Sequence, residues 1–269
     1  MDRHPNGTEP AVATSISTLR ALGRLLRLAL HVLAGLWTVT RRFPHWDADT
    51  RAARIQTWSA QALAILGVAV RVHGEPPAHG PRLVVANHVS WLDILVIDAV
   101  RPCRFVAKAD VHRWPLLGRL VAGAGTLFIE RERKRDALRV VHRLAERLQA
   151  GDVLAVFPEG TTSAGATVLP FHANLLQAAL ATDTPVQPLG VAYRAAGAAP
   201  DALARHDAPV YVGDTSLLTS LWRVVRAHDL VACLHWGEAQ TAQGRDRRSW
   251  AVALRAEVAA LAGLPPPID

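Results

Sequence analysis

The chain has 269 residues, of which 50% are hydrophobic, so it is neither disordered nor fibrous and can form one large α/β domain or two small ones. Its two cysteines are too few for a disulfide framework and have no histidine nearby at zinc-site spacing, so a structural metal is not expected. The net charge of +7, carried almost entirely by arginine, calls for an acidic partner such as nucleic acid, anionic lipid or a phosphorylated substrate.

The first 72 residues divide into a tail and a helical region. Residues 1–15 are polar and contain two prolines, and we expect a flexible tail there. Two apolar runs follow, at residues 28–39 and 55–70, and arginines lie at both ends of each run. This pattern predicts a pair of helices within residues 16–72.

Both apolar runs are shorter than the ~20 residues that a helix needs to cross a bilayer. Flanking arginines and nearby tryptophans are typical of helices that lie in the headgroup region of an anionic membrane. The tryptophans are Trp37, Trp46 and Trp58. Two other interpretations stay open: both helices pack into the core of the domain, or residues 22–40 form a single tilted span.

Residues 73–81 are rich in proline and glycine and are expected to link the helices to a domain over residues 82–269. Strand patterns occur at residues 82–87, 103–108, 125–131, 152–157, 185–193 and 230–238, and residues 208–213 also read as extended. Helix patterns occur at residues 90–100, 134–150, 174–182 and 249–263. This alternation predicts an α/β fold: a single domain with a mixed central sheet flanked by helices, preceded by the membrane-interfacial helix pair.

Polar side chains cluster directly after the strand at residues 82–87, namely Asn87, His88, Ser90 and Asp93. If His88 lies on the turn and Asp93 in the first turn of the next helix, the carboxylate can hold one ring nitrogen and leave the other as a general base. The alternative is a helix cap, because Ser90 and Asp93 fit the S-x-x-D pattern. Capping leaves the Asn-His pair unexplained.

A second cluster follows the strand at residues 152–157. In the sequence FPEGTTS, Pro158 and Gly160 predict a turn that presents Glu159 at its tip. Such a turn exposes the backbone N–H groups of Gly160, Thr161 and Thr162, which would form a cradle for an anion or oxyanion. The alternative is a plain turn with an exposed acid.

Two further cations stand at strand ends, Lys108 after residues 103–108 and Arg131 after residues 125–131. Each one alone reads as a solvated surface charge. The carboxyl ends of parallel strands share one edge of a sheet, however, and ligands bind there. We therefore expect His88, Lys108, Arg131 and Glu159 to lie along one rim.

Four blocks of sequence now resemble a known family. They are NHVSWLD, FVAKADV with the later FIER, FPEGTTS, and PVQPLGVAY, in that order between about Val84 and Tyr193. They are similar to the blocks of glycerolipid acyltransferases, which include the bacterial 1-acylglycerol-3-phosphate acyltransferases. The resemblance implies an acyl thioester as co-substrate, on acyl carrier protein or coenzyme A, with a lysolipid as acceptor and no other cofactor or metal.

The resemblance also implies roles for the clustered residues. His88 would deprotonate the lysolipid hydroxyl, and Asp93 would orient His88 in the H-x4-D motif. Lys108 and Arg131 would hold the acceptor head group. The turn would line the acceptor site with Glu159, Gly160, Thr161 and Thr162.

The implied function is a membrane-associated lysolipid O-acyltransferase at the cytoplasmic face of a bacterial inner membrane, monotopic or peripheral, that converts 1-acylglycerol-3-phosphate to phosphatidic acid in phospholipid biosynthesis. One position departs from the family, which usually has arginine as a phosphate ligand where this chain has Thr162. Lyso-ornithine lipid is therefore the alternative acceptor, and a lipid hydrolase with the same base is a further alternative. A non-catalytic nucleic-acid binder is not expected, because aromatic–basic stripes are missing.

Overall fold

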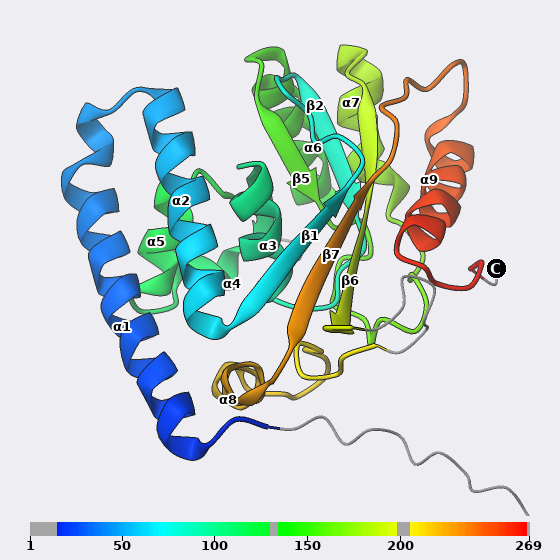
Figure 1. The fold of residues 1–269 in the computed structure, drawn as a ribbon. Helices are drawn as coiled ribbons and strands as arrows, with labels where there is room; N and C mark the ends of the chain where they lie inside the picture. Colours follow the sequence, from blue (N-terminus) through cyan, green and yellow to red (C-terminus); the bar gives the residue numbers. More distant parts are fainter. Residues whose placement is uncertain (1–14, 130–133, 198–204, 268–269) are drawn as a thin grey trace, which may run out of the picture.

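The computed structural model describes residues 15–129, 134–197 and 205–267 and shows a central sheet with helices on both faces (Figure 1). Residues 1–14 of the expected tail and Arg131 lie outside the described residues. Within these residues the sheet has seven strands in the order β1-β7-β6-β2-β5-β3-β4. Neighbouring strands are parallel except for β6 and β7, which are antiparallel. The predicted single α/β domain with a mixed sheet is confirmed.

The strands are β1 Val68–His73, β2 Arg82–Ala86, β3 Arg104–Lys108, β4 Leu127–Ile129, β5 Val153–Val156, β6 Val186–Ala195 and β7 Leu230–Trp236. The helices are α1 Thr18–Arg41, α2 Ala48–Leu66, α3 Leu92–Val100, α4 Ala109–His112, α5 Leu117–Gly123, α6 Lys134–Gln149, α7 Leu176–Thr182, α8 Leu217–Arg226 and α9 Arg247–Leu261. Short 3₁₀ turns occupy Phe43–His45 and Ala173–Leu175.

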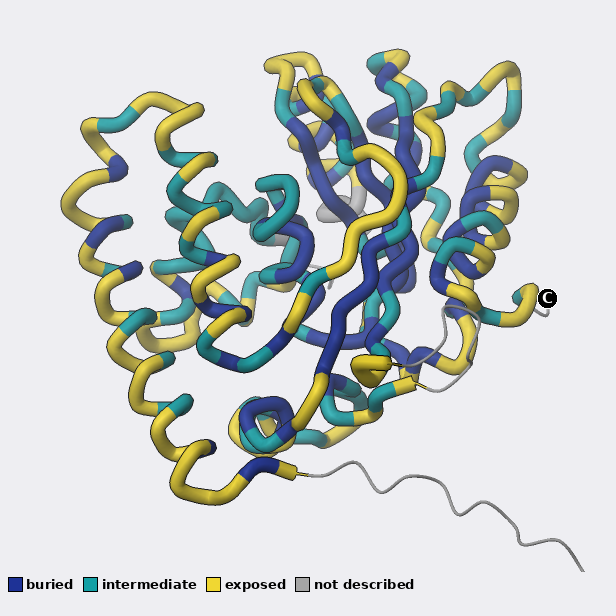
Figure 2. Tube along the Cα trace, in the orientation of Figure 1, coloured by how far each residue is buried: buried dark blue, intermediate teal, exposed yellow. Residues whose placement is uncertain are grey.

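The sheet separates two hydrophobic cores, one under α2, α3 and α8 and the other under α6, α7 and α9. Strand β2 lies centrally and is buried on both faces, as the dark tube in Figure 2 shows. Val84 and Ala86 belong to the first core, whereas Leu83 and Val85 belong to the second. Because successive side chains of a strand point to opposite faces, a strand covered on both sides needs a continuous apolar run. This rigid strand leads directly into His88.

Helices α1 and α2 form the expected pair. They cross where Gly35 of α1 leaves no room for a side chain, since an added Cβ would lie 2.6 Å from Trp58 Nε1. His31 stacks on the same indole with ring centroids 4.7 Å apart. Helix α2 also buries Leu63 and Leu66 in the first core. The contact with the domain is therefore made mainly through α2.

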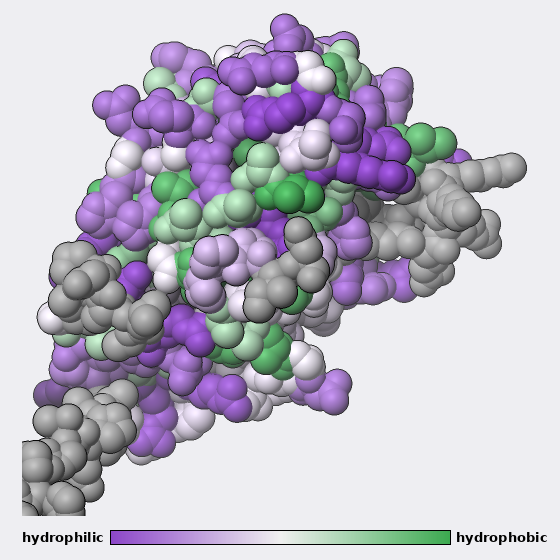
Figure 3. Space-filling model, turned by 90° about the vertical axis from the view of Figure 1, so that its right-hand side faces the viewer, coloured by the Kyte–Doolittle hydropathy of each residue, from purple (hydrophilic) through white to green (hydrophobic). Residues whose placement is uncertain are grey.

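Helix α1 leaves an apolar stripe exposed. Its members recur every three or four residues and so share one face: Leu19, Leu22, Leu26, Leu30, Leu33 and Trp37. Within the described part of the chain, one segment, Thr18–His45, is long and apolar enough to cross a membrane, and only 11% of its apolar window is buried. Reading α1 as a core helix is therefore wrong. The side of the molecule that carries α9 is largely hydrophilic by contrast (Figure 3).

The structure differs from the sequence prediction in three segments. The helical region was expected to reach Val72, but α2 ends at its C-cap Gly67, which adopts a left-handed conformation with φ of 77°. Strand β1 follows directly and pairs with β7. Residues 208–213, expected to be extended, form an irregular loop with turns, and α8, which Ser216 caps, was not predicted.

Candidate active site

The described part of the predicted rim, without Arg131, exists because β2, β5, β3 and β4 run parallel as neighbours. Their carboxyl ends therefore lie along one edge of the sheet. His88 follows β2, Glu159 follows β5, and Lys108 ends β3. The loops after β2 and β5, which contain the two polar clusters found in the sequence, therefore lie at this edge.

His88 and Asp93 converge as predicted. His88 Nδ1 lies 2.8 Å from Asp93 Oδ2, and Asp93 is fully buried in the first turn of α3. The imidazole stacks on Phe157, with ring centroids 3.9 Å apart and an interplanar angle of 10°. A buried carboxylate at Nδ1 favours the tautomer with the proton on Nδ1, which leaves Nε2 as the proton acceptor.

The same carboxylate also caps the loop. Asp93 Oδ2 accepts hydrogen bonds from the backbone N–H groups of Val89 at 2.8 Å and Ser90 at 2.9 Å. The cap and the support of the imidazole are therefore two roles of one side chain. These bonds fix the loop against α3 and with it the position of His88.

Tyr193 is a partner of Asp93 that was not among the predicted site residues. Its hydroxyl donates to Asp93 Oδ1 at 2.6 Å, and the residue is buried on β6. Burial, followed by the charge of Asp93, raises the pKa of Tyr193 well above its usual value. The phenol therefore stays protonated and acts as a permanent donor. The only hint in the sequence is that Tyr193 ends the fourth block of the family resemblance.

Glu159 faces inward, so the expectation of an exposed acid at the tip of the turn is wrong. Its Oε1 accepts from His88 N–H at 2.6 Å and its Oε2 from Leu169 N–H at 2.8 Å, and the residue is 5% exposed. Two backbone donors make the interior acceptable to a carboxylate. Burial raises the pKa of Glu159, while these hydrogen bonds oppose the shift.

The turn after β5 is joined to the His88 loop at further points. Ser163 N–H donates to His88 O at 2.8 Å, and Thr162 Oγ1 donates to the carbonyl oxygen of Tyr211. Gly160 N–H closes the turn by donating to Phe157 O at 3.0 Å, so it is not available to the expected anion cradle. Thr161 is exposed.

Lys108 is exposed at the end of β3, on the rim. Its proposed companion Arg131 lies outside the described residues, but β3 and β4 are in register with Lys108 opposite Ile129. Among the side chains that the structure describes, no group of three or more histidine, cysteine, aspartate or glutamate residues could hold a metal ion.

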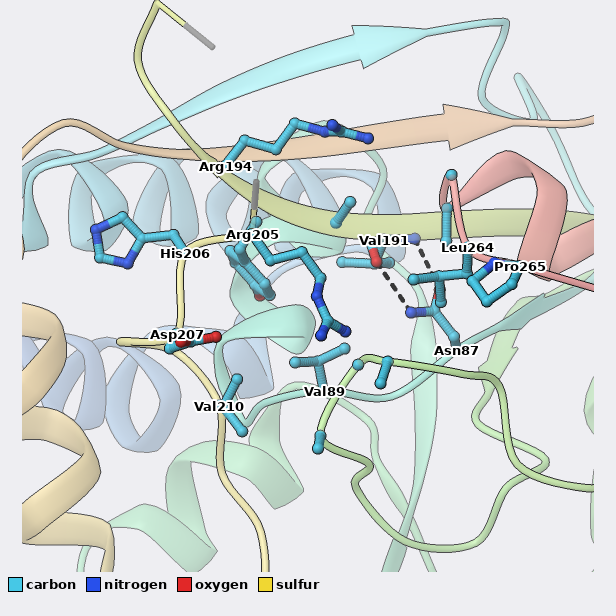
Figure 4. A pocket seen from close by; sticks show the side chains of 17 residues that line it. Asn87, Val89, Val191, Arg194, Arg205, His206, Asp207, Val210, Leu264 and Pro265 are labelled. Atoms are coloured by element: carbon cyan, nitrogen blue, oxygen red, sulfur yellow. Dashed lines mark hydrogen bonds between the residues drawn. The ribbon is translucent and has the colours of Figure 1, made fainter. Parts of the chain in front are cut away.

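A cavity of about 180 Å³ opens beside the His88 loop, on the side of β6 (Figure 4). Asn87 and Val89, which flank His88 in the chain, line it together with Tyr193, Arg205 and Asp207. The amide of Asn87 is bonded to Val191 N and O, at 2.8 and 2.9 Å, which joins the end of β2 to β6. No pattern in the sequence predicts this cavity.

Comparison with known proteins gives the family. Residues 69–192 match the family model described as Acyltransferase. Over 238 residues the chain is 41% identical to a lyso-ornithine lipid O-acyltransferase from Pseudomonas aeruginosa, a match that covers 86% of this chain and 89% of that protein. The chain belongs to the acyltransferase family. The resemblance seen in the sequence is thereby confirmed.

Other relatives of this acyltransferase differ in their named acceptor. A 1-acyl-sn-glycerol-3-phosphate acyltransferase from Neisseria gonorrhoeae is 41% identical over 166 residues, which are 61% of this chain and 62% of that protein. The crystal structure of the 1-acyl-sn-glycerophosphate acyltransferase PlsC from Thermotoga maritima aligns with a TM-score of 0.59 and 21% identity, over 90% of this chain and 96% of that chain. The acyltransferase therefore shares its fold with PlsC.

Proposed function

We propose that this acyltransferase moves a fatty acyl group from a thioester, on acyl carrier protein or coenzyme A, to the hydroxyl of lyso-ornithine lipid. The observation that carries this acceptor is the match along 86% of the chain to a protein of that name. Thr162 supports it, because its hydroxyl is bonded to Tyr211 O and it offers no guanidinium for a phosphate.

In the proposed reaction, His88 Nε2 takes the proton of the acceptor hydroxyl while the hydroxyl oxygen attacks the thioester carbonyl carbon. The tetrahedral intermediate then collapses, the carbon–sulfur bond breaks, and the imidazolium returns the proton to the leaving thiolate. Asp93 keeps the ring in one tautomer and stabilises its positive charge. A thioester is already activated, so the reaction needs no cofactor, metal or covalent enzyme intermediate.

Glu159 and Tyr193 are positioning residues in this proposal. Glu159 fixes the backbone of His88, and Tyr193 fixes the carboxylate that supports the imidazole. Neither side chain needs to touch substrate. Their bonds hold the base and its support in place before substrate arrives, which lowers the cost of alignment.

A second candidate acceptor is 1-acylglycerol-3-phosphate, and the Neisseria relative favours it with the same 41% identity. For this acceptor, Lys108 and Arg131 are the proposed phosphate ligands, and Thr161 and Thr162 line the site. A hydrolase would use the same base with water as the nucleophile. It would consume acyl thioester without any acceptor lipid.

The proposed setting is the cytoplasmic face of an inner membrane, with the exposed stripe of α1 in the headgroup region. Arg20 and Arg27 are exposed on the same helix as the exposed leucines. Arginine near an anionic surface and leucine below it are the combination that interfacial helices use. Acyl chains and lysolipid then reach the rim from the membrane.

The test is an acceptor panel with the full chain in mixed micelles and a labelled acyl thioester. We expect label in lyso-ornithine lipid, analysed by mass spectrometry, and no label with the His88→Ala variant. Product from 1-acylglycerol-3-phosphate alone would overturn the proposed acceptor. Free fatty acid as the only product would overturn transfer itself.

A further inference from the structure

The cavity beside the His88 loop takes no part in the reaction steps proposed above. Its volume of about 180 Å³ is smaller than the roughly 300–1,000 Å³ of pockets for drug-sized ligands, so it suits a small head group and not a fatty acyl chain. Asn87 and Val89 form one wall, each a single residue away from the proposed base. A group bound here therefore lies against the loop that carries His88, although the imidazole itself stacks on Phe157 and does not line the cavity.

Two opposite charges point into this cavity from one loop. Figure 4 shows Arg205 extended toward Asn87 and Val89, with the carboxylate of Asp207 turned to the same side. A methyl group added to Gly165 would lie 3.5 Å from Arg205 Nη1 and 3.4 Å from Val89 Cγ2, so the guanidinium reaches the wall of the His88 loop. Neither Arg205 nor Asp207 takes part in an ion pair within the described part of the chain.

The loop that carries these charges is tied to the proposed active site at both ends. His206 N–H donates to Tyr193 O at 2.9 Å, and Tyr211 N–H donates to Val89 O at 3.1 Å. Thr162 adds a bond from its hydroxyl to Tyr211 O. Arg205 and Asp207 are thus held at a set distance from His88 by the backbone, as specific recognition requires.

We propose that this cavity binds the zwitterionic head group of the acceptor, an inference that rests on lyso-ornithine lipid being the substrate. The head group of that lipid has a free carboxylate and a free primary amine. Arg205 pairs with the carboxylate, for which a guanidinium offers two parallel hydrogen bonds, and Asp207 accepts from the ammonium. Asp207 also repels the doubly charged phosphate of 1-acylglycerol-3-phosphate, so the same pair of charges selects against it.

The experiment measures kcat and KM of the full chain with both acceptors for Arg205→Gln and Asp207→Asn. The exposed Arg223→Gln and Asp214→Asn serve as matched controls, and thermal unfolding of each variant checks its fold. With lyso-ornithine lipid, we expect KM to rise at least tenfold for Arg205→Gln and about fivefold for Asp207→Asn, with kcat within about twofold, because a contact made equally in the ground and transition states acts on KM. With 1-acylglycerol-3-phosphate, Asp207→Asn should lower KM.

A modified acceptor identifies the partner of Arg205. Methylation of the ornithine carboxylate should raise KM tenfold for the wild type and leave it unchanged for Arg205→Gln, since the contact is already lost. If methylation of the acceptor and the Arg205→Gln substitution raise KM additively, the proposal is overturned. It is also overturned if KM rises for Lys108→Gln and not for Arg205→Gln. If the wild type acylates only 1-acylglycerol-3-phosphate, the proposed acceptor is overturned. If the wild type acylates lyso-ornithine lipid but Arg205→Gln and Asp207→Asn have the same KM as the wild type, only the role of the cavity is overturned.

Discussion

Tyr193 donates its hydroxyl hydrogen to Asp93 Oδ1 across 2.6 Å, on the side of the carboxylate opposite His88. The two residues lie 100 positions apart in the chain, on β6 and α3. The hydrogen bond stabilises the charged carboxylate and so limits how strongly Asp93 holds the Nδ1 proton of His88. The hydroxyl of Tyr193 thereby fixes the carboxylate that holds the imidazole.

We predict that Tyr193→Phe lowers kcat at least tenfold with little change in KM, because the carboxylate that holds the imidazole loses a donor. A hydrogen bond to a charged group contributes about 1.5–3 kcal/mol, and a tenfold change in rate corresponds to about 1.4 kcal/mol. The other tyrosine of the chain gives the control Tyr211→Phe, which leaves Asp93 intact. A lower unfolding temperature with wild-type kcat in the folded fraction would mean that the hydroxyl only stabilises the fold.

A second prediction concerns Glu159→Gln. In the wild type, the N–H groups of His88 and Leu169 each donate to one carboxylate oxygen of Glu159. The glutamine amide has a single oxygen acceptor, so its NH₂ group faces one of these two N–H groups. We expect a loss of about 1–3 kcal/mol in stability, because a buried donor is left without its acceptor. As the affected donor belongs to His88, kcat should fall at least tenfold with little change in KM.

Steady-state kinetics at a temperature well below unfolding separates these two effects. Glu238→Gln, an exposed glutamate after β7, should change neither stability nor kcat. If the folded fraction of Glu159→Gln keeps wild-type kcat, the carboxylate does not position the base.

The meeting of His88 and Asp93 could be predicted from the sequence because it depends on local geometry. A loop residue and a residue in the first turn of the next helix are five positions apart, and the strand before them was recognisable as a buried apolar run. The common rim followed from the parallel pairing of β2, β5 and β3.

The burial of Glu159 and the cavity beside the His88 loop could not be predicted in the same way. Glu159 carries a charge in a proline–glycine turn, a context that favours exposure, and only the backbone N–H groups of His88 and Leu169 make its burial acceptable. The cavity depends on how the loop with Arg205 and Asp207 folds back on Val89. Such contacts between distant segments leave no periodic signal in a sequence.

A third prediction concerns the buried carboxyl group of Asp98 on α3. Burial raises its pKa to about 8, and the hydrogen bond from Cys103 N–H at 3.1 Å opposes this shift. An unfolded chain ionises this group above about pH 4, whereas the folded protein keeps it protonated up to about pH 8. Its contribution to stability is therefore complete below pH 4 and declines between about pH 4 and 8.

Asp98→Asn removes this ionisation and keeps an acceptor for Cys103 N–H. Denaturant unfolding should show the variant as stable as the wild type near pH 4.5 and more stable at pH 8, by about 1–3 kcal/mol after allowance for relaxation around the charge. A difference between the two proteins that is the same at both pH values would contradict a raised pKa of Asp98.

The last prediction concerns the exposed apolar stripe of α1. Leu26 and Leu30 are 64% and 58% exposed, so changing both to glutamine should leave the unfolding temperature unchanged. Full burial of a leucine contributes about 1.5–3 kcal/mol, and partial insertion of two in a headgroup region should account for at least tenfold in binding to anionic vesicles. Vesicle co-sedimentation measures this loss.

The double variant Leu138→Gln with Val252→Gln is the matched control, because it removes two exposed apolar side chains, 74% and 56% exposed, from α6 and α9 instead. It should bind vesicles as the wild type does. If α1 supplies membrane access, the Leu26/Leu30 variant should also lose transfer to acceptor presented in vesicles and keep transfer to acceptor in detergent micelles. Equal losses with both presentations would mean that these leucines serve the reaction and not the membrane contact, because micelles deliver the acceptor without requiring α1 to dock.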